Sequence, residues 1–362
     1  MVGVGANGFP GYSPQFSDDY TRDSYALYGD LSADVTDAFF LQGAMRYEDY
    51  SDFGSEVVGK LASRYTLNEI FGVRGSIGTG FRAPTPGQQG TTNVSTRLPD
   101  GFPVATGLFP ASGPVAQALG ASPLKPETST NYTIGMTASL PVGSVTVDFY
   151  RIDLEDRFNS ISTRPVSAEE GTDGYENFLA LRDAGVAGAD TIGGVFYFTN
   201  AFDTRTEGVD IVSNFPIDWA NGGTTSLTAS LNYNKEEYTS DPGSQNEEDQ
   251  FDFNNQSRWR GVFSARHNIG PFSIMGRANA YGPSANFNAG EVQEYKTKVL
   301  VDVEGNYDFS DSITLTLGGR NIFDQYPPVD RTGDYCCGRV YSSGTPISWQ
   351  GSYFFGRLRA DF

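Results

Sequence analysis

Apolar and polar side chains alternate with a period of two along much of this chain, as in a β-strand with two different faces. Ile313, Leu315 and Leu317 alternate with serine and threonine, and residues 297–308 alternate in the same way with Leu300 as the one exception. About thirteen such segments are found. They predict strands over 22–33, 38–50, 54–66, 70–82, 127–140, 143–157, 194–216, 224–234, 255–268, 271–283, 297–308, 312–322 and 349–362.

The connections between these segments alternate in length. Short turns follow one end of the predicted strands, and long loops follow the other. The long loops are 83–126, 158–193, 239–254, 284–296 and 323–348. Short periplasmic turns and long extracellular loops are typical of an antiparallel transmembrane β-barrel of the outer membrane. The phase of the alternation slips around Tyr150 and Arg151, which predicts a bulge or the point where a strand leaves the membrane.

Composition favours the same all-β class. The chain has 26 Phe and 20 Tyr among 362 residues, and aromatic side chains suit strands and membrane interfaces. A mean hydropathy of −0.36, without a long apolar run, excludes a transmembrane helix. The net charge of −19 argues against a nucleic-acid partner.

The predicted topology places the start of the chain on the extracellular side. If the long loops are extracellular, the last strand runs down to the periplasm and the first, 22–33, also runs downward. Residues 1–21 are then expected to be the remnant of an extracellular loop, with residues 22–362 forming the barrel part. We expect earlier strands to precede this chain, because an open sheet would leave two unpaired edges in lipid.

Four segments, in this order, resemble the C-terminal half of the barrel of TonB-dependent receptors. They are 79–85 (TGFRAPT), 124–129 (LKPETS), 199–210 (TNAFDTRTEGVD) and 319–328 (GRNIFDQYPP). The resemblance implies a Gram-negative outer-membrane receptor that imports a scarce nutrient, such as a ferric siderophore, cobalamin or a glycan. It also implies a 22-stranded barrel of which this chain supplies the later strands, with TonB and a plug domain outside this chain as partners.

Five arginines are predicted to face the lumen. They can pair with carboxylates of the plug implied by the resemblance, line a polar substrate path, or simply be solvated. They are Arg74, Arg82, Arg258, Arg260 and Arg277.

The C-terminal strand alternates apolar residues up to a terminal aromatic. By resemblance, this is the signal read by the barrel-assembly machinery, and its residues are Phe354, Leu358, Ala360 and Phe362. The other expected partners of such a wall are outer-membrane lipid and lipopolysaccharide.

Loop residues supply the remaining candidates. Aromatic side chains in the two longest loops can stack on a ligand or pack within the loops; they are Phe102, Phe109, Tyr175 and Phe178. Cys336 and Cys337 are adjacent in another long loop, where a strained disulfide, free thiols or a metal site are the alternatives.

The sequence offers little for catalysis. The glycine pattern of residues 3–8 matches a nucleotide fingerprint, but no strand precedes it and prolines follow where a helix should begin. His267 is the only histidine, and its position near a strand end indicates an interfacial side chain. We therefore expect no enzyme activity and no cofactor. A passive pore and a secreted all-β binding module are the alternative functions.

Overall fold

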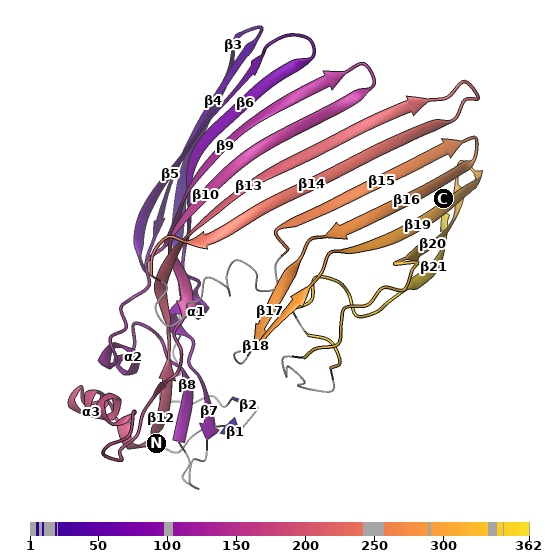
Figure 1. The fold of residues 1–362 in the computed structure, drawn as a ribbon. Coiled ribbons are helices and arrows are strands. Elements are labelled where there is room, and N and C mark those ends of the chain that lie inside the picture. Colours follow the sequence, from indigo (N-terminus) through magenta and orange to yellow (C-terminus); the bar gives the residue numbers. More distant parts are fainter. Residues whose placement is uncertain are drawn as a thin grey trace.

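The computed structural model describes residues 5–6, 9–10, 19, 21–97, 104–241, 257–288, 291–331, 339–342 and 344–361. Its main feature is a curved, 13-stranded antiparallel sheet, which confirms the predicted all-β class (Figure 1). Neighbouring strands follow one another in chain order from β3 to β21. The strands are β3 (Ser24–Thr36), β4 (Phe39–Tyr50), β5 (Gly54–Thr66), β6 (Phe71–Arg82), β9 (Glu127–Leu140), β10 (Gly143–Ser160), β13 (Phe198–Asp218), β14 (Thr224–Tyr238), β15 (Trp259–Ile269), β16 (Phe272–Tyr281), β19 (Lys298–Ser310), β20 (Ile313–Arg320) and β21 (Tyr353–Ala360).

The sheet has one apolar face and one polar face. Residues paired across neighbouring strands share a face, so Ile134 lies in one row with Phe149 and Val209. Ile134 and Phe149 are 65% and 53% exposed, as expected of side chains that contact lipid instead of a protein core. We call this face, whose rows also contain Val301 and Leu315, the outward face.

The opposite face, here called the inner face, has rows of hydrogen-bonding side chains. Thr228 and Ser264 are joined across β14 and β15 at 2.6 Å, and Asn279 donates to Asp302 across β16 and β19 at 2.9 Å. Leu300, the exception in the sequence pattern, lies on this face opposite Asn279. No helix in the described ranges is long and apolar enough to cross a membrane.

The last strand agrees with the predicted placement of its apolar residues. Phe354, Leu358 and Ala360 pair with Gly319, Leu315 and Ile313, so all three lie on the outward face. Phe362 lies outside the described residues. Recognition of this strand by the assembly machinery stays a prediction.

A bulge at Tyr150 and Arg151, one of the two interpretations of the phase change there, is wrong. The other interpretation, that the strand leaves the membrane at this point, stays a prediction. Pairing of β10 with β13 continues without a shift through both residues, and the irregularity lies between Leu154 and Phe158. Asp156 adopts a φ of 56° there, which turns the strand toward its loop. The sequence pattern changed at Arg151 because the outward row itself turns from apolar to charged.

The two longest loops fold together into one unit, here called the loop unit. It contains a four-stranded sheet, β11 (Arg164–Pro165), β12 (Ile192–Phe196), β8 (Val104–Leu108) and β7 (Asn93–Arg97), in that order. β12 and β8 are parallel although they come from different loops. The helices α1 (Pro86–Gly90), α2 (Pro114–Ala118) and α3 (Tyr175–Asp183) complete it at the end of the main sheet away from the short turns (Figure 1).

The loop unit has its own hydrophobic core. Leu181 and Val195 are fully buried, and Val94, Val115 and Ile192 are each 2% exposed. The sequence pattern predicts only long loops here, because the core is built by residues of two loops that are distant in the chain. A smaller element at the same end of the main sheet is the hairpin β17 (Ser284–Asn288) and β18 (Glu291–Tyr295) (Figure 1).

Candidate functional site: the outer mouth

The outer mouth is the rim where the strands enter the long loops, and Glu127 lies at its centre. Arg82 donates from Nη2 to Glu127 Oε1 at 2.6 Å, and the Phe158 backbone N–H donates to the same oxygen at 2.6 Å. The Arg82 guanidinium also lies over the Phe158 ring, 5.2 Å from its centroid. Glu127 is only 6% exposed. One carboxylate therefore ties β6, β9 and β10 together where both loops begin.

Replacing Glu127 with alanine should destabilise this rim by roughly 1–3 kcal/mol, because the Phe158 N–H and the Arg82 guanidinium both lose their acceptor. The measurement is the free energy of unfolding from a urea titration of the protein in vesicles. Glu170→Ala, which removes an exposed carboxylate in the second long loop, is the matched control and should change little. Equal effects of the two substitutions would contradict the role given to Glu127.

A second set of contacts fixes the last residues of β10 and the end of the first long loop. Arg157 Nη1 donates to Glu236 Oε1 at 2.7 Å and to Thr204 Oγ1 at 3.0 Å. Asn200 bonds the Lys125 N–H and carbonyl, at 3.0 and 2.9 Å, and also the Asp156 carbonyl, at 2.8 Å. The end of the first long loop and the start of the second are thus held against β13.

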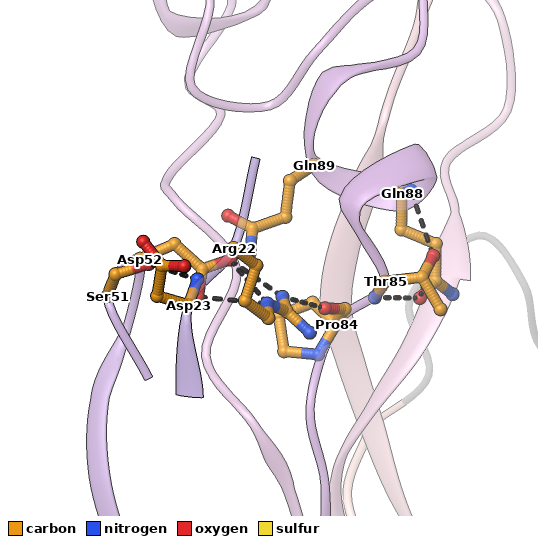
Figure 2. A network of polar contacts seen from close by, with 8 residues as sticks. All are labelled: Arg22, Asp23, Ser51, Asp52, Pro84, Thr85, Gln88 and Gln89. Carbon is orange, nitrogen blue, oxygen red and sulfur yellow. Dashed lines mark hydrogen bonds and ion pairs between the residues drawn. The ribbon is translucent and has the colours of Figure 1, made fainter. Parts of the chain in front are cut away.

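The third set of contacts joins the first long loop to β3 and β4 (Figure 2). Arg22 forms a forked ion pair with Asp52, with Nη2 to Oδ2 at 2.7 Å, and its Nη2 also donates to the Pro84 carbonyl. Gln89 Nε2 donates to the same Asp52 carboxylate at 2.6 Å. Thr85 is the N-cap of α1, which begins with a capping box. The loop therefore leaves the rim in a fixed direction.

Sequence reasoning did not single out Arg22 and Asp52, and it noted Glu127 only as part of the segment 124–129. Their partners are distant in the chain, so nothing local indicates the pairing. The one local signal was the spacing of Thr85 and Gln88, which fits the capping box that begins α1.

The five predicted arginines fall into two groups. Arg82 is at the rim, and Arg74 reaches across β9 to Asp148, with Nε to Oδ1 at 2.8 Å. Arg74, Gly135 and Asp148 share one row, and a Cβ at Gly135 would lie 2.0 Å from Asp148 Oδ1. Glycine there leaves room for the ion pair between non-neighbouring strands.

The other three arginines lie on β15 and β16 or just before them. Arg260 and Arg277 are on the inner face, opposite Asn232 and Asp302 respectively. Neither makes an ion pair with any residue in the described ranges. Arg258 precedes β15, and its carbonyl accepts from the Asn234 N–H at 2.8 Å.

Arg277 also lines a pocket of about 160 Å³ on the inner face. Two further arginines that sequence reasoning did not single out share it, together with two carboxylates. The charged lining residues are Arg266, Arg277, Arg320, Asp302 and Glu304. The structure thus groups three guanidiniums that lie on three different strands.

The predicted ligand-contact aromatics are found mainly inside the loop unit. Phe109 is 1% exposed in its core, so it packs there and presents no surface to a ligand. Phe178 packs against that core and stacks on Tyr175, with ring centroids 6.3 Å apart. Phe102 lies outside the described residues. Of the three aromatic residues that the structure describes, Tyr175 and Phe178 keep partly accessible side chains.

The described ranges contain no cluster of three His, Cys, Asp or Glu that could hold a metal ion. Cys336 and Cys337 lie outside those ranges. His267 is on the outward face near a short turn, where its Nδ1 and Thr225 Oγ1 are 2.8 Å apart.

Residues 2–322 match the family described as TonB dependent receptor-like, beta-barrel. The chain belongs to this family. TonB-dependent receptors are Gram-negative outer-membrane proteins and transporters, not enzymes.

Similar proteins within the TonB-dependent receptors include the ferric enterobactin receptor PirA of Pseudomonas aeruginosa. It is 23% identical over 302 residues, which cover 83% of this chain and 37% of that protein. The crystal structure of the siderophore receptor PirA from Acinetobacter baumannii has a TM-score of 0.69 at 16% identity, covering 100% of this chain and 49% of that one. The ferric enterobactin receptor PfeA of Pseudomonas aeruginosa gives a TM-score of 0.68 at 16% identity, covering 99% and 48%. The chain thus spans about half or less of the length of these relatives.

Proposed function

We propose that this chain forms the wall and outer mouth of an energised importer of ferric siderophores. The observation that carries the proposal is its family membership together with the relatives named above, which are siderophore or ferric enterobactin receptors. A plug domain inside the wall and the TonB protein would supply gating and energy. Cobalamin and glycans are the other cargoes that the sequence resemblance allows.

The inner face has chemistry suited to an anionic iron chelate. Arg260 and Arg277 present guanidiniums toward the lumen, and Arg277 belongs to a group of three arginines around one pocket. Guanidinium groups form forked hydrogen bonds with carboxylate and catecholate oxygens. The same arginines can pair with carboxylates of a plug while the lumen is closed.

The outer mouth supports the proposal from the other end. Folded loops are the usual place for ligand recognition on a rigid scaffold. Here the loop unit is held to the rim through Glu127, Asn200 and the Arg22–Asp52 pair. Such anchoring fixes a recognition surface in front of the lumen, with Tyr175 and Phe178 as its accessible aromatic pair.

Uptake of ⁵⁵Fe-enterobactin into cells that lack other catecholate receptors tests this function. The receptor that contains this chain should restore uptake, and an uncoupler of the proton-motive force should abolish it. Uptake that persists with the uncoupler would favour the passive pore instead. Uptake of labelled cobalamin or glycan, with none of the iron chelate, would replace the proposed cargo.

A further inference from the structure

The outward face is not apolar throughout. On β10, β13 and β14 two successive outward rows are fully charged: Arg151, Glu207 and Lys235 form the lower row, and Asp153, Arg205 and Glu237 form the upper row. We call these six residues the outward charged patch. Signs alternate along both rows and between them.

The patch begins where the apolar part of each strand ends. The row directly below it is Phe149, Val209 and Tyr233, which are apolar or aromatic. On β14, Thr225 to Lys235 spans the roughly 9–11 residues that a tilted strand needs to cross the hydrocarbon. β13 has 21 residues, so it continues well beyond that length. The patch therefore lies at and just above the outer boundary of the hydrocarbon.

Basic side chains on the outward face are confined to this patch. Within the described strands of the main sheet, the other outward rows contain no lysine or arginine. Arg64, Arg266 and Arg357, for example, all belong to inner rows. Three cations thus gather on three adjacent strands, in two successive rows of one sector of the wall.

The contacts inside the patch leave the two lower cations accessible. Arg151 donates from Nε to Asp153 Oδ2 at 2.9 Å, and its side chain is 41% exposed. Lys235 Nζ lies 2.7 Å from Glu237 Oε2, and its side chain is 45% exposed. An arginine has five N–H donors and a lysine three, so each can serve an acceptor in addition to its carboxylate.

Cross-strand opposite charges contribute roughly 0.2–1 kcal/mol each and help fix the register. That role does not explain why the cations are on the outward face and at this depth, since inner-face pairs would do the same. The surface continues directly from the lipid-facing rows, so its neighbour is the headgroup layer of the outer leaflet. Phosphates in that layer are the acceptors that exposed Arg and Lys bind best.

We propose that the outward charged patch binds the phosphorylated headgroup of lipopolysaccharide. Arg151 and Lys235 would donate to its phosphates, while the acyl chains lie against Phe149, Val209 and Tyr233. Asp153 accepts from both Arg151 and Arg205, so it orients these two cations on the patch. This inference does not depend on which cargo is transported.

The test counts lipopolysaccharide molecules retained by the protein after extraction from outer membranes, by native mass spectrometry. Wild type should retain lipopolysaccharide, and Arg151→Gln with Lys235→Gln should lower the retained fraction at least five-fold. Arg151→Lys with Lys235→Arg, which keeps both charges, should retain most of it. Lys60→Gln with Arg359→Gln, which removes the same charge from the inner face, is the matched control and should match wild type.

Competition on the wild-type protein keeps the test decisive even if the double variant does not assemble. Phosphorylated lipid A should displace the retained lipopolysaccharide, whereas dephosphorylated lipid A should not. Equal displacement by both, or unchanged retention in the assembled double variant, would overturn the proposal. Displacement by phosphatidylglycerol alone would assign the patch to an ordinary phospholipid and overturn it as well.

Discussion

Val301→Arg is expected to destabilise the membrane-inserted fold by about 2–4 kcal/mol, because the charge would face the hydrocarbon near its middle. Val301 is on the outward face of β19, opposite Ala278, in the row that contains Ala229. Ala229 lies near the middle of the part of β14, Thr225 to Lys235, that is long enough to cross the hydrocarbon. The measurement is a urea titration of folding into lipid vesicles, supported by the amount of protein that reaches the outer membrane.

The neighbouring residue provides the matched control. Leu300 is also an aliphatic side chain in β19, but it lies on the inner face opposite Asn279. Leu300→Arg would place its guanidinium in the lumen near Asp302, so its cost should be far smaller. If both substitutions destabilised the protein equally, the assignment of the two faces would be wrong.

Leu181→Ala should unfold the loop unit without unfolding the wall. Leu181 is fully buried in the core shared by the two longest loops. Removing a buried leucine side chain from a packed core costs about 2–5 kcal/mol, a large share of what so small a core can supply. We expect rapid proteolysis within residues 83–126 and 158–193, while the heat-modifiable mobility of the barrel on gels is unchanged.

Arg182→Ala is the control for this prediction. Arg182 is the next residue, and its ion pair with Asp183 is exposed, so its loss should have almost no effect. Proteolysis of both variants at the wild-type rate would mean that the loops do not share a core.

The strands of the main sheet were predictable from the sequence because the alternation of apolar and polar residues within each strand indicates its two faces. The alternation of Ile313, Leu315 and Leu317 with polar residues is local to one strand. The structure confirms that all three lie on the outward face. Connection lengths then gave the order of the hairpins. The structure differs from these predictions in the bounds of single strands and in the position of the bulge, which lies between Leu154 and Phe158.

The loop unit was not predictable in the same way. β8 and β12 pair in parallel although more than eighty residues separate Leu108 from Ile192. Such long-range pairing has no local periodicity, and the aromatic residues that suggested ligand contacts, Phe109 above all, serve this core instead.

Pairing between residues that are distant in the chain also explains why the sequence indicated only some of the residues at the outer mouth. Arg82 was identified because it lies on the polar side of an alternating strand, but its acceptor Glu127 lies 45 positions further along. Arg22 and Asp52 are 30 positions apart, and Asp52 lies between two predicted strands. Ion pairs of this kind depend on strand register, which only the assembled sheet defines.

We expect the main sheet to be a wall with lipid on one face and an aqueous path on the other. Spin labels placed singly at residues 299 to 304 in β19, in the membrane-inserted protein, test it most directly. Accessibility to oxygen, which concentrates in lipid, should be high at 299, 301 and 303, and accessibility to an aqueous nickel complex should be high at 300, 302 and 304. Accessibility without this period-two alternation, or with the two sets reversed, would contradict the account.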